Sequence, residues 1–326
     1  MSNPKKALIF GISGQDGAYL ARWLLSHGYG VHGTSRDREA AGFGNLRALG
    51  ILDQVVLHSA VLLDFRSLFQ VLNQVRPSEV YNLAGQTSVG LSFQQPIETF
   101  ESIALGTLNI MECLRLLELP ARFFNAASSE CFGDVSEPVT ESSPLRPRSP
   151  YAMAKAAAFW NVANYREAYN LFACSGILFN HESPLRPARF VTRKIISAAV
   201  RIARGSQERL KLGNLDVYRD WGWAPEYMEA VWRMLQHHQP EDFIIATGHT
   251  HALRDFVDIT FRALGLNWHD HVDIDRSLLR PSDLVHVSAD PSKIAARLGW
   301  RAEVGFAELI DRMIAAEQQA EVPSRG

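Results

Sequence analysis

The sequence has few cysteines and almost no net charge. It holds three cysteines in 326 residues, and 33 Lys and Arg nearly balance 35 Asp and Glu, which leaves a formal charge of −2. Cys113, Cys131 and Cys174 are widely spaced within apolar runs, so they argue against a disulfide scaffold and predict reduced core residues. The small net charge excludes a global attraction to nucleic acid or membrane, and any anionic ligand must be held by locally placed Arg and Lys.

The sequence also lacks a membrane span, a signal peptide and a metal-binding pattern. No apolar run is long enough to cross a bilayer, and the polar residues 2–6 lead directly into a short apolar strand. No Cys/His cluster has metal-ligand spacing, and we interpret His237, His238 and the histidines of 268–271 as surface residues. These absences favour a cytoplasmic protein without a metal site and with neither a nucleic-acid nor a membrane partner.

Strands and helices alternate along the first half of the chain. Apolar strands are expected over 7–10, 31–34, 54–58, 79–84 and 122–127, and helices over 18–27, 65–75 and 100–117. Alternation of this kind predicts βαβ crossovers, and therefore an α/β fold with a doubly wound, Rossmann-like parallel sheet.

The alternation becomes irregular after Asn180. Helices are expected over 193–204 and 225–236, a strand over 243–247, and a frayed polar tail over 317–326. We predict a nucleotide-binding domain over residues 1–180, to which some later segments return, and a smaller mixed substrate domain over residues 181–326.

A glycine-rich turn lies between the first expected strand and the first expected helix. Its glycines follow a G-x-x-G-x-x-G spacing, which allows a tight turn and lets backbone N–H groups approach a pyrophosphate at the helix N-terminus. The bare pattern is common, but its place in a βαβ unit makes it a strong indication of dinucleotide binding. The predicted contacts are Gly11, Ser13, Gly14, Gln15, Asp16 and Gly17.

The residues after the second strand bear on the choice of cofactor. An NAD-specific fold normally places an acidic residue there for the ribose hydroxyls, whereas this chain has Arg36, Asp37 and Arg38. Arg36 suits the 2′-phosphate of NADP, so NADP is favoured, although Asp37 could instead bind the ribose of NAD. Asp64 is expected near the adenine amino group, and Ala84 is expected to pass close to the cofactor.

Tyr151 and Lys155 are candidates for acid–base chemistry. They are four residues apart, so a helix would place phenol and ammonium on one face. An ammonium beside a tyrosine favours the phenolate, which can act as a general base. Ser128 and Glu130 lie just upstream, and an extended strand would direct both side chains to the same face. Alone, the Tyr-x-x-x-Lys pattern could equally be a solvated pair.

Several longer runs carry a family resemblance. The chain resembles the extended short-chain dehydrogenase/reductases that act on nucleotide sugars, and within them the GDP-mannose 4,6-dehydratase family. The Asn-His-Glu-Ser-Pro and Arg-Asp-Trp-Gly runs are the most specific. The runs that carry the resemblance are 11–20, 81–84, 147–152, 176–184, 190–194, 212–216 and 219–222.

The resemblance implies a lyase with tightly bound NADP that is recycled in each catalytic cycle. GDP-mannose would be oxidised at C4, would lose water across C5–C6, and would take hydride back at C6, giving GDP-4-dehydro-6-deoxy-mannose. Tyr151 would remove the 4-hydroxyl proton while Lys155 holds the phenolate and the nicotinamide ribose. Glu130 would take the C5 proton and protonate the departing 6-hydroxyl, and Ser128 would hydrogen-bond the 4-oxygen.

The resemblance also assigns the GDP half of the substrate to the second domain. Asn180, Arg219 and Arg280 would lie against the diphosphate, and Val191 and Lys194 would flank guanine. Gly213 would let the backbone pass close to the nucleotide. Asp283 stands where the family has glutamate in an Arg-Pro-x-Glu element, and this shortening places its ribose contact in doubt.

Departures from the family pattern leave some questions open. Ala127 and Ser128 stand where Ser and Thr are usual, and residues 35–44 replace a segment with paired arginines that reaches a neighbouring subunit. We expect a homodimer formed through a helix bundle, or a homotetramer. Alternative functions are the same chemistry on another GDP-sugar such as a GDP-heptose, a GDP-4-keto-6-deoxy-sugar reductase or epimerase, and a non-catalytic NADP-binding scaffold.

Overall fold

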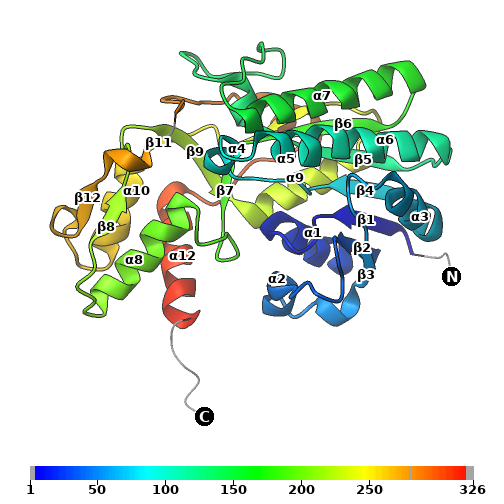
Figure 1. Ribbon diagram of the computed structural model, residues 1–326. Coiled ribbons are helices and arrows are strands. Elements are labelled where there is room, and N and C mark those ends of the chain that lie inside the picture. The colour runs from blue at the N-terminus through cyan, green and yellow to red at the C-terminus, as the bar shows by residue number, and fades with distance from the viewer. Residues whose placement is uncertain (1–3, 280, 321–326) are drawn as a thin grey trace.

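The centre of the molecule is a seven-stranded sheet in which every neighbouring pair is parallel (Figure 1). The computed structural model describes residues 4–279 and 281–320. Across the sheet the strand order is β10-β6-β5-β4-β1-β2-β3. The strands are β1 (Lys6–Phe10), β2 (Gly30–Ser35), β3 (Val56–Ser59), β4 (Glu79–Asn82), β5 (Arg122–Ser128), β6 (Ala173–Leu178) and β10 (Phe243–Ile245).

The strand order reverses between β1 and β4, where the chain turns from one half of the sheet to the other. In open parallel sheets a ligand crevice forms outside the carboxyl ends of the strands at this point. The predicted doubly wound α/β architecture is therefore present, with its switch point beside the glycine-rich turn.

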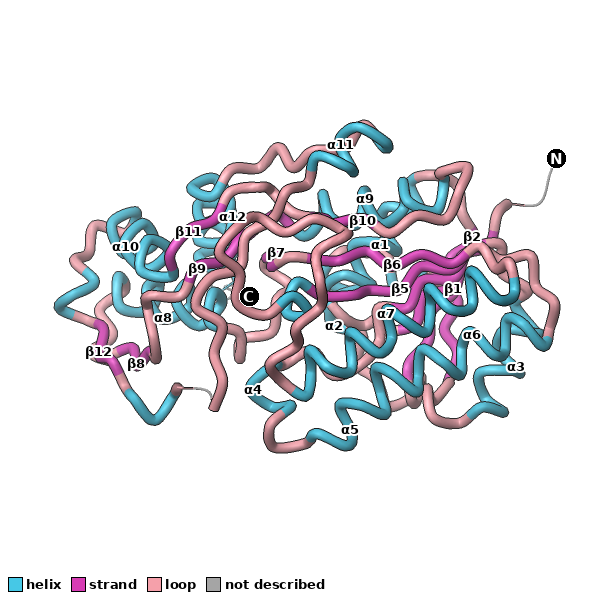
Figure 2. The backbone as a smooth tube through the Cα atoms, turned by 90° about the horizontal axis from the view of Figure 1, so that it is seen from above, coloured by secondary structure: helices cyan, strands magenta, loops and turns pink. Residues whose placement is uncertain are grey.

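Helices cover both faces of this sheet (Figure 2). In β1, Ala7 and Ile9 pack into the core shared with α1 and α9, whereas Leu8 and Phe10 pack into the core shared with α3 and α6. A strand that is buried on both faces has a continuous run of apolar residues, and β1 has such a run. The helices of this part are α1 (Gln15–Ser26), α2 (Gly44–Ala48), α3 (Phe65–Val75), α4 (Val89–Ser92), α5 (Pro96–Phe100), α6 (Gly106–Leu116), α7 (Pro150–Tyr169), α9 (Ala224–Gln236) and α11 (Ser292–Leu298).

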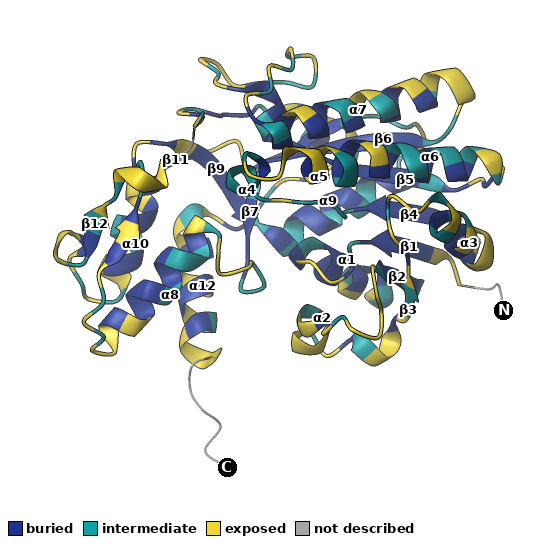
Figure 3. Ribbon diagram, viewed as in Figure 1, coloured by how far each residue is buried: buried dark blue, intermediate teal, exposed yellow. Residues whose placement is uncertain are grey.

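A second core lies beside the carboxyl edge of the sheet. Its helices are α8 (Val191–Ala203), α10 (Leu253–Ala263) and α12 (Phe306–Ala320), and its short strands are β7 (Asn180–Glu182), β8 (Leu210–Leu212), β9 (Tyr218–Trp223), β11 (Thr250–Ala252) and β12 (Val272–Ile274). These strands pair as β11-β9-β7 and β12-β8. Figure 3 shows that the inner sides of α8, α10 and α12 are buried. The chain enters this part at β7, and α9 and β10 return to the large sheet.

Two expectations need correction. The helix expected over 100–117 begins earlier, at α5, and reaches α6 through a π-helical turn over Glu101–Leu105. The polar tail expected from 317 is still helical through Ala320, because Glu317 is buried and forms an ion pair with Arg193 of α8. Residues 321–326 of that expected tail lie outside the described residues.

The start of α7 is fixed by its own sequence. Ser149 has extended backbone angles, and its side chain accepts a hydrogen bond from Ala152 N at 3.1 Å, while Pro150 occupies the first helical position. Serine at the N-cap and proline at the first position are both favoured at helix N-termini. This cap sets where the helix begins, and therefore where Tyr151 lies in its first turn.

Replacing Ser149 with alanine should lower the free energy of unfolding by about 1 kcal/mol, because the Ala152 N–H loses its acceptor at a buried cap. Urea unfolding followed by circular dichroism measures the change. Ser292→Ala, at an exposed serine in the first turn of α11, is the matched control and should change stability much less. Equal effects of the two substitutions would contradict the role assigned to the cap.

Candidate active site

A cavity of about 390 Å³ opens where the carboxyl ends of the large sheet face the second core. It is lined by all four predicted catalytic residues and by six of the seven residues predicted to hold the substrate. Arg280, the seventh, lies outside the described residues. The predicted residues that line the cavity are Asp16, Ser128, Glu130, Tyr151, Lys155, Asn180, Val191, Lys194, Gly213, Arg219 and Asp283.

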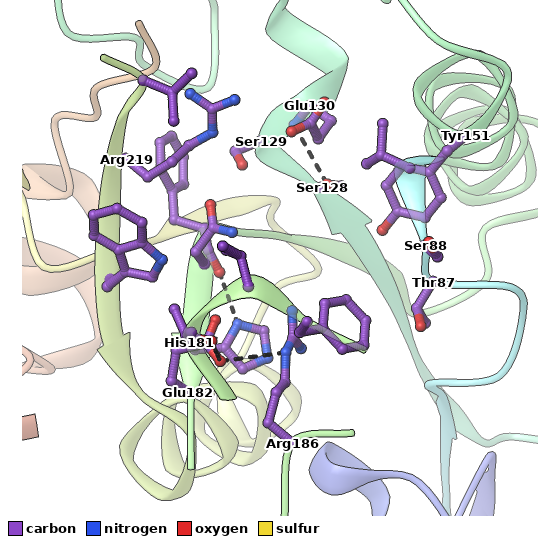
Figure 4. A pocket seen from close by; sticks show the side chains of 18 of the residues that line it. Thr87, Ser88, Ser128, Ser129, Glu130, Tyr151, His181, Glu182, Arg186 and Arg219 are labelled. Carbon is purple, nitrogen blue, oxygen red and sulfur yellow. Dashed lines mark hydrogen bonds and ion pairs between the residues drawn. The ribbon is translucent and has the colours of Figure 1, made fainter. Parts of the chain in front are cut away.

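Ser128 and Glu130 reach the cavity in a way that the sequence did not predict. β5 ends at Ser128, and Ser129–Phe132 form a 3₁₀ turn, so the two side chains do not share one face of an extended strand. The turn begins there because the Ser128 hydroxyl accepts a hydrogen bond from Glu130 N at 3.3 Å. Both side chains still line the cavity (Figure 4).

Tyr151 and Lys155 project from the first two turns of α7 and are both buried. The Lys155 ammonium lies 5.9 Å from the centre of the Tyr151 ring. Its Nζ donates a hydrogen bond to the Ala126 carbonyl oxygen at 2.6 Å, which anchors it to β5. The spacing of the pair therefore gave the correct helix face, with the lysine bound to the strand rather than to the phenol.

The pKa of the Tyr151 phenol lies above its usual value, which corrects the expectation drawn from the Tyr-x-x-x-Lys spacing. Burial raises this pKa more than the neighbouring Ser128 hydroxyl lowers it. Burial also lowers the pKa of Lys155 to about 8, because the ammonium is removed from water. In the protein without ligands the phenol is therefore protonated at neutral pH.

The glycine-rich turn has the shape that a dinucleotide pyrophosphate requires. Gly11 has φ +84°, and a Cβ at this position would lie 2.8 Å from Ala84 N. A Cβ at Gly17 would lie 2.4 Å from the Gly11 carbonyl oxygen. Gly14, the N-cap of α1, has no side chain with which to cap the helix. The first N–H groups of α1 are thus available to an anionic group.

The side chains of Gln15 and Asp16 point toward the second core. Gln15 Oε1 accepts a hydrogen bond from the Ser183 hydroxyl at 2.7 Å, and Asp16 Oδ2 lies 3.0 Å from His181 Nε2. Only Asp16 of the two lines the cavity. A dinucleotide at this turn would therefore meet Gln15 through its backbone.

Arg36 and Asp37, which follow β2, have different surroundings. Arg36 is exposed directly after the strand. Asp37 Oδ1 accepts hydrogen bonds from the backbone N–H groups of Glu39 at 2.9 Å and Ala40 at 3.3 Å, so its carboxylate stabilises its own turn. Asp64, after β3, caps α3 by accepting a hydrogen bond from Arg66 N at 3.1 Å.

The predicted cations of the substrate side are held by backbone carbonyl groups. The buried Arg219 guanidinium donates to the Tyr218 and Leu284 carbonyl oxygens, each at 2.8 Å, and Asp283 lies 3.8 Å from it. Lys194 Nζ donates to the Lys211 carbonyl oxygen at 2.6 Å. These contacts fix both cations at the cavity wall.

The cavity also contains polar residues to which the sequence analysis gave no role. Thr87 and Ser88 follow β4 and line it, and Ser88 caps α4 by accepting a hydrogen bond from Leu91 N at 3.2 Å. Their place after the strand at the switch point was the signal that could have identified them. The other cavity-lining polar residues of this kind include Glu182, Arg186, Thr192 and Lys211.

Two further classes of feature are absent from the described residues. Among residues 4–279 and 281–320, no group of three or more His, Cys, Asp or Glu side chains could hold a metal ion. No helix in these same ranges is both long and apolar enough to cross a bilayer.

Comparison with known proteins assigns the chain to a family. A family model described as GDP-mannose 4,6 dehydratase matches residues 8–313. The chain belongs to the GDP-mannose 4,6-dehydratase family. It is 44% identical over 322 residues to GDP-mannose 4,6 dehydratase 1 of Arabidopsis thaliana, covering 95% of this chain and 89% of that relative. It is 41% identical over 344 residues to GDP-mannose 4,6 dehydratase of Homo sapiens, covering 97% of this chain and 92% of that relative.

A solved structure supports the fold of this family member independently. UDP-glucose 4-epimerase of Thermus thermophilus, determined as a complex with NAD, superposes with a TM-score of 0.84 at 26% identity, covering 97% of this chain and 99% of that chain. The predicted family and fold class are both confirmed.

The lowered pKa of Lys155 has a consequence for stability. Below about pH 8 the lysine is protonated in both folded and unfolded states, and between about pH 8 and 10 only the unfolded state retains the proton. Stability should therefore rise with pH in this window. The free energy of unfolding of the wild-type chain minus that of Lys155→Met should increase by about 2–3 kcal/mol from about pH 8 to 10. Urea denaturation at a series of pH values measures this difference.

The Lys5→Met variant, referred to the same wild-type chain, is the control, because the Lys5 side chain is exposed whereas that of Lys155 is buried. If the difference in free energy of unfolding between the wild-type chain and Lys155→Met stays constant from about pH 8 to 10, burial does not lower the pKa of Lys155.

Proposed function

We propose that the chain is an NADP-dependent lyase that converts GDP-mannose to GDP-4-dehydro-6-deoxy-mannose. The observation that carries the proposal is the meeting of Ser128, Glu130, Tyr151 and Lys155 in one cavity. An enzyme that only moved hydride would need a tyrosine–lysine pair but no additional carboxyl group. Family membership supports the same reaction.

The first step is the loss of a proton from the sugar 4-hydroxyl to Tyr151. When bound, oxidised NADP would supply a positive charge, a hydride acceptor for C4 and, once reduced, a hydride donor for C6, and it would therefore be recycled. A positive charge beside the phenol favours the phenolate, opposing the effect of burial. Ser128 donates a hydrogen bond to the 4-oxygen, and Lys155 fixes the helix face that carries the phenol by its bond to Ala126.

The second step is the elimination of water, for which we propose Glu130. The 4-ketone acidifies the C5 proton, which passes to the Glu130 carboxylate. The resulting carboxylic acid then gives that proton to the 6-oxygen, and the C6–O bond breaks as water leaves. One carboxyl group thus acts first as base and then as acid, and it is unchanged at the end. When C6 then accepts hydride, C5 takes a proton from solvent, and Tyr151 releases to solvent the proton that it took from the 4-hydroxyl.

For the cofactor, the turn after β2 supports NADP. Asp37 accepts two backbone hydrogen bonds from its own turn, which leaves it poorly placed to bind ribose hydroxyls. Arg36 is exposed at the strand end and suits a 2′-phosphate. We still propose that Asp64 lies near the adenine amino group and that Ala84 passes close to the cofactor.

For the substrate, we propose that the cavity wall of the second core binds the GDP half. The diphosphate would lie against Asn180, Arg219 and Arg280, with Val191 and Lys194 beside guanine. The backbone carbonyl contacts that hold Arg219 and Lys194 support this assignment, because they preorganise two cations at the wall. Gly213 and Asp283 complete the proposed nucleotide contacts.

We assign residues 1–180 to NADP binding and 181–326 to nucleotide-sugar binding. The separate core of α8, α10 and α12 supports this division. β10 pairs with β6, so this part of the later chain completes the first domain. A cytoplasmic location agrees with the buried, unpaired cysteines.

We propose that the chain forms a homodimer, or a homotetramer built from such dimers, through α5 and α7. Large apolar side chains are exposed on these neighbouring helices, where a second copy would bury them. They include Ile97, Phe100, Met153 and Trp160, which are 73%, 42%, 50% and 61% exposed. A bundle of helices from two copies would cover them.

The reaction can be tested by incubating the purified chain with GDP-mannose in deuterated water. Mass spectrometry should detect loss of water and one solvent deuteron, located at C5 by NMR, without net accumulation of NADPH. NADPH formed in proportion to product, or no turnover, would refute the proposed reaction.

Glu130→Gln should abolish the loss of water, with kcat falling by roughly 10²–10⁴-fold, because glutamine can neither take nor give the proton. Binding of GDP-mannose, measured by calorimetry, should be retained. Glu101→Gln, a change at a carboxyl group in the π-helical turn and absent from the cavity lining, is the control and should leave kcat unchanged. Normal turnover by Glu130→Gln would remove this residue from the mechanism.

Trp160→Glu should shift the chain toward monomer, because a carboxylate would be buried where two apolar faces meet. Sedimentation velocity measures the change. The control is Leu279→Glu, at an exposed apolar position. Trp268→Glu would not serve, because Trp268 is buried in the second core and its replacement would unfold the chain. Wild-type chain that sediments as a monomer would refute the proposed assembly.

A further inference from the structure

A largely buried group of polar side chains connects the glycine-rich turn to the second core. It consists of Gln15 and Asp16 at the start of α1 and of His181 and Ser183 in and after β7; we call this group the clasp. The Ser183 hydroxyl donates to Gln15 Oε1 at 2.7 Å, and Gln15 Nε2 donates to Asp16 Oδ1 at 2.9 Å. His181 Nε2 lies 3.0 Å from Asp16 Oδ2.

The contacts of His181 indicate that it is an imidazolium ion. Its Nδ1 lies 2.7 Å from the Phe179 carbonyl oxygen, and its Nε2 faces the Asp16 carboxylate. Both partners are acceptors, so both ring nitrogens must carry a proton for both contacts to be attractive. The pair therefore consists of a cation and an anion at the cavity edge, with His181 buried and Asp16 half-buried.

The surrounding charges agree with this assignment. Burial lowers the pKa of His181, but the Asp16 carboxylate raises it more, so the pKa lies above its usual value. Burial likewise raises the pKa of Asp16, but His181 lowers it more and holds it well below its usual range. The positive charge of Arg186 lowers the pKa of His181. The ring of Tyr227 from α9 stacks on the imidazole, with ring centroids 4.8 Å apart. Asp16 also favours the charged form of Lys155 across the cavity.

The position of Asp16 gives the pair a role beyond stability. A carboxylate at a helix N-terminus built for a pyrophosphate would repel that anion unless a cation balanced it. His181 supplies the balancing charge from β7, the strand that also contains Asn180 and Glu182. The same contact thus neutralises the turn and fixes β7 against it.

We propose that the Asp16–His181 ion pair is a positioning clasp that makes the anion-binding turn compatible with a dinucleotide and holds the sugar-side strand β7 in register with it. The inference rests on the proposed function, because it takes the turn to bind NADP and β7 to bind the nucleotide sugar. Neither residue needs to touch the reacting atoms. Each acts through the geometry and charge of its partner.

The decisive test compares His181→Gln, Asp16→Asn and the double variant. His181→Gln leaves the Asp16 carboxylate unbalanced, so NADP⁺ binding should weaken by about tenfold or more. Asp16→Asn removes the anion and should bind NADP⁺ at least as well as wild type. The double variant places two amides in contact and should recover most of the NADP⁺ affinity lost in His181→Gln. Retained cofactor after gel filtration and NADP⁺ titration by calorimetry provide the measurements.

The catalytic parameters provide a second readout. In Asp16→Asn the imidazole loses the charge that keeps it protonated, so kcat should acquire a decline as pH rises through neutrality that the wild-type profile lacks. KM for GDP-mannose should change much less than kcat. His32→Gln removes a half-buried histidine whose Nδ1 lies 3.0 Å from His58 Nε2 on the edge of the sheet, and this control should match wild type in every assay.

The outcomes separate the two proposals. A double variant that binds NADP⁺ as weakly as His181→Gln would overturn the clasp, because it would mean that His181 itself contacts the cofactor. Asp16→Asn that loses NADP⁺ as severely as His181→Gln would overturn it as well. If the wild-type chain does not turn over GDP-mannose, the proposed function fails, whereas titrations with NADP⁺ still test the clasp.

Discussion

Parallel pairing of β1, β4, β5 and β6 is the constraint on which the cavity depends. The register sets Phe10 beside Asn82 and Ser128 beside Leu178. The chain therefore leaves all four strands at one edge of the sheet. The glycine-rich turn, the Ser128–Glu130 turn and β7 meet there although they are far apart in the sequence. An antiparallel arrangement of the same strands would separate these groups.

The large sheet and most of the candidate site could be predicted because their signals are local. Apolar runs separated by helical periodicity specify βαβ units, and the glycine spacing specifies a turn between two of them. The strands of the second core are different. β7, β8, β11 and β12 have three residues each, too few to show a periodicity, and they exist because tertiary contacts align them.

The errors at the site share a physical cause. The sequence placed Tyr151 and Lys155 on one helix face correctly, but the direction of the phenol pKa depends on burial, which only the packing of α7 against β5 reveals. Similarly, Ser128 reads as part of a continuous strand, yet its hydroxyl caps the next turn and changes the direction of Glu130. Side-chain hydrogen bonds to nearby backbone compete with strand structure at such positions.

Burial at the cavity disfavours the charged forms of both Tyr151 and Lys155 in the free protein. The same low-dielectric surroundings strengthen every charge–charge interaction that a bound ligand makes there. A cation brought beside the phenol would therefore change its protonation more than it would in water. The clasp follows the same reasoning, since a carboxylate drawn partly out of water at the turn is tolerable only with His181 beside it. Groups whose charged forms are disfavoured by burial at the cavity are thus those whose protonation responds most strongly to a charge placed beside them.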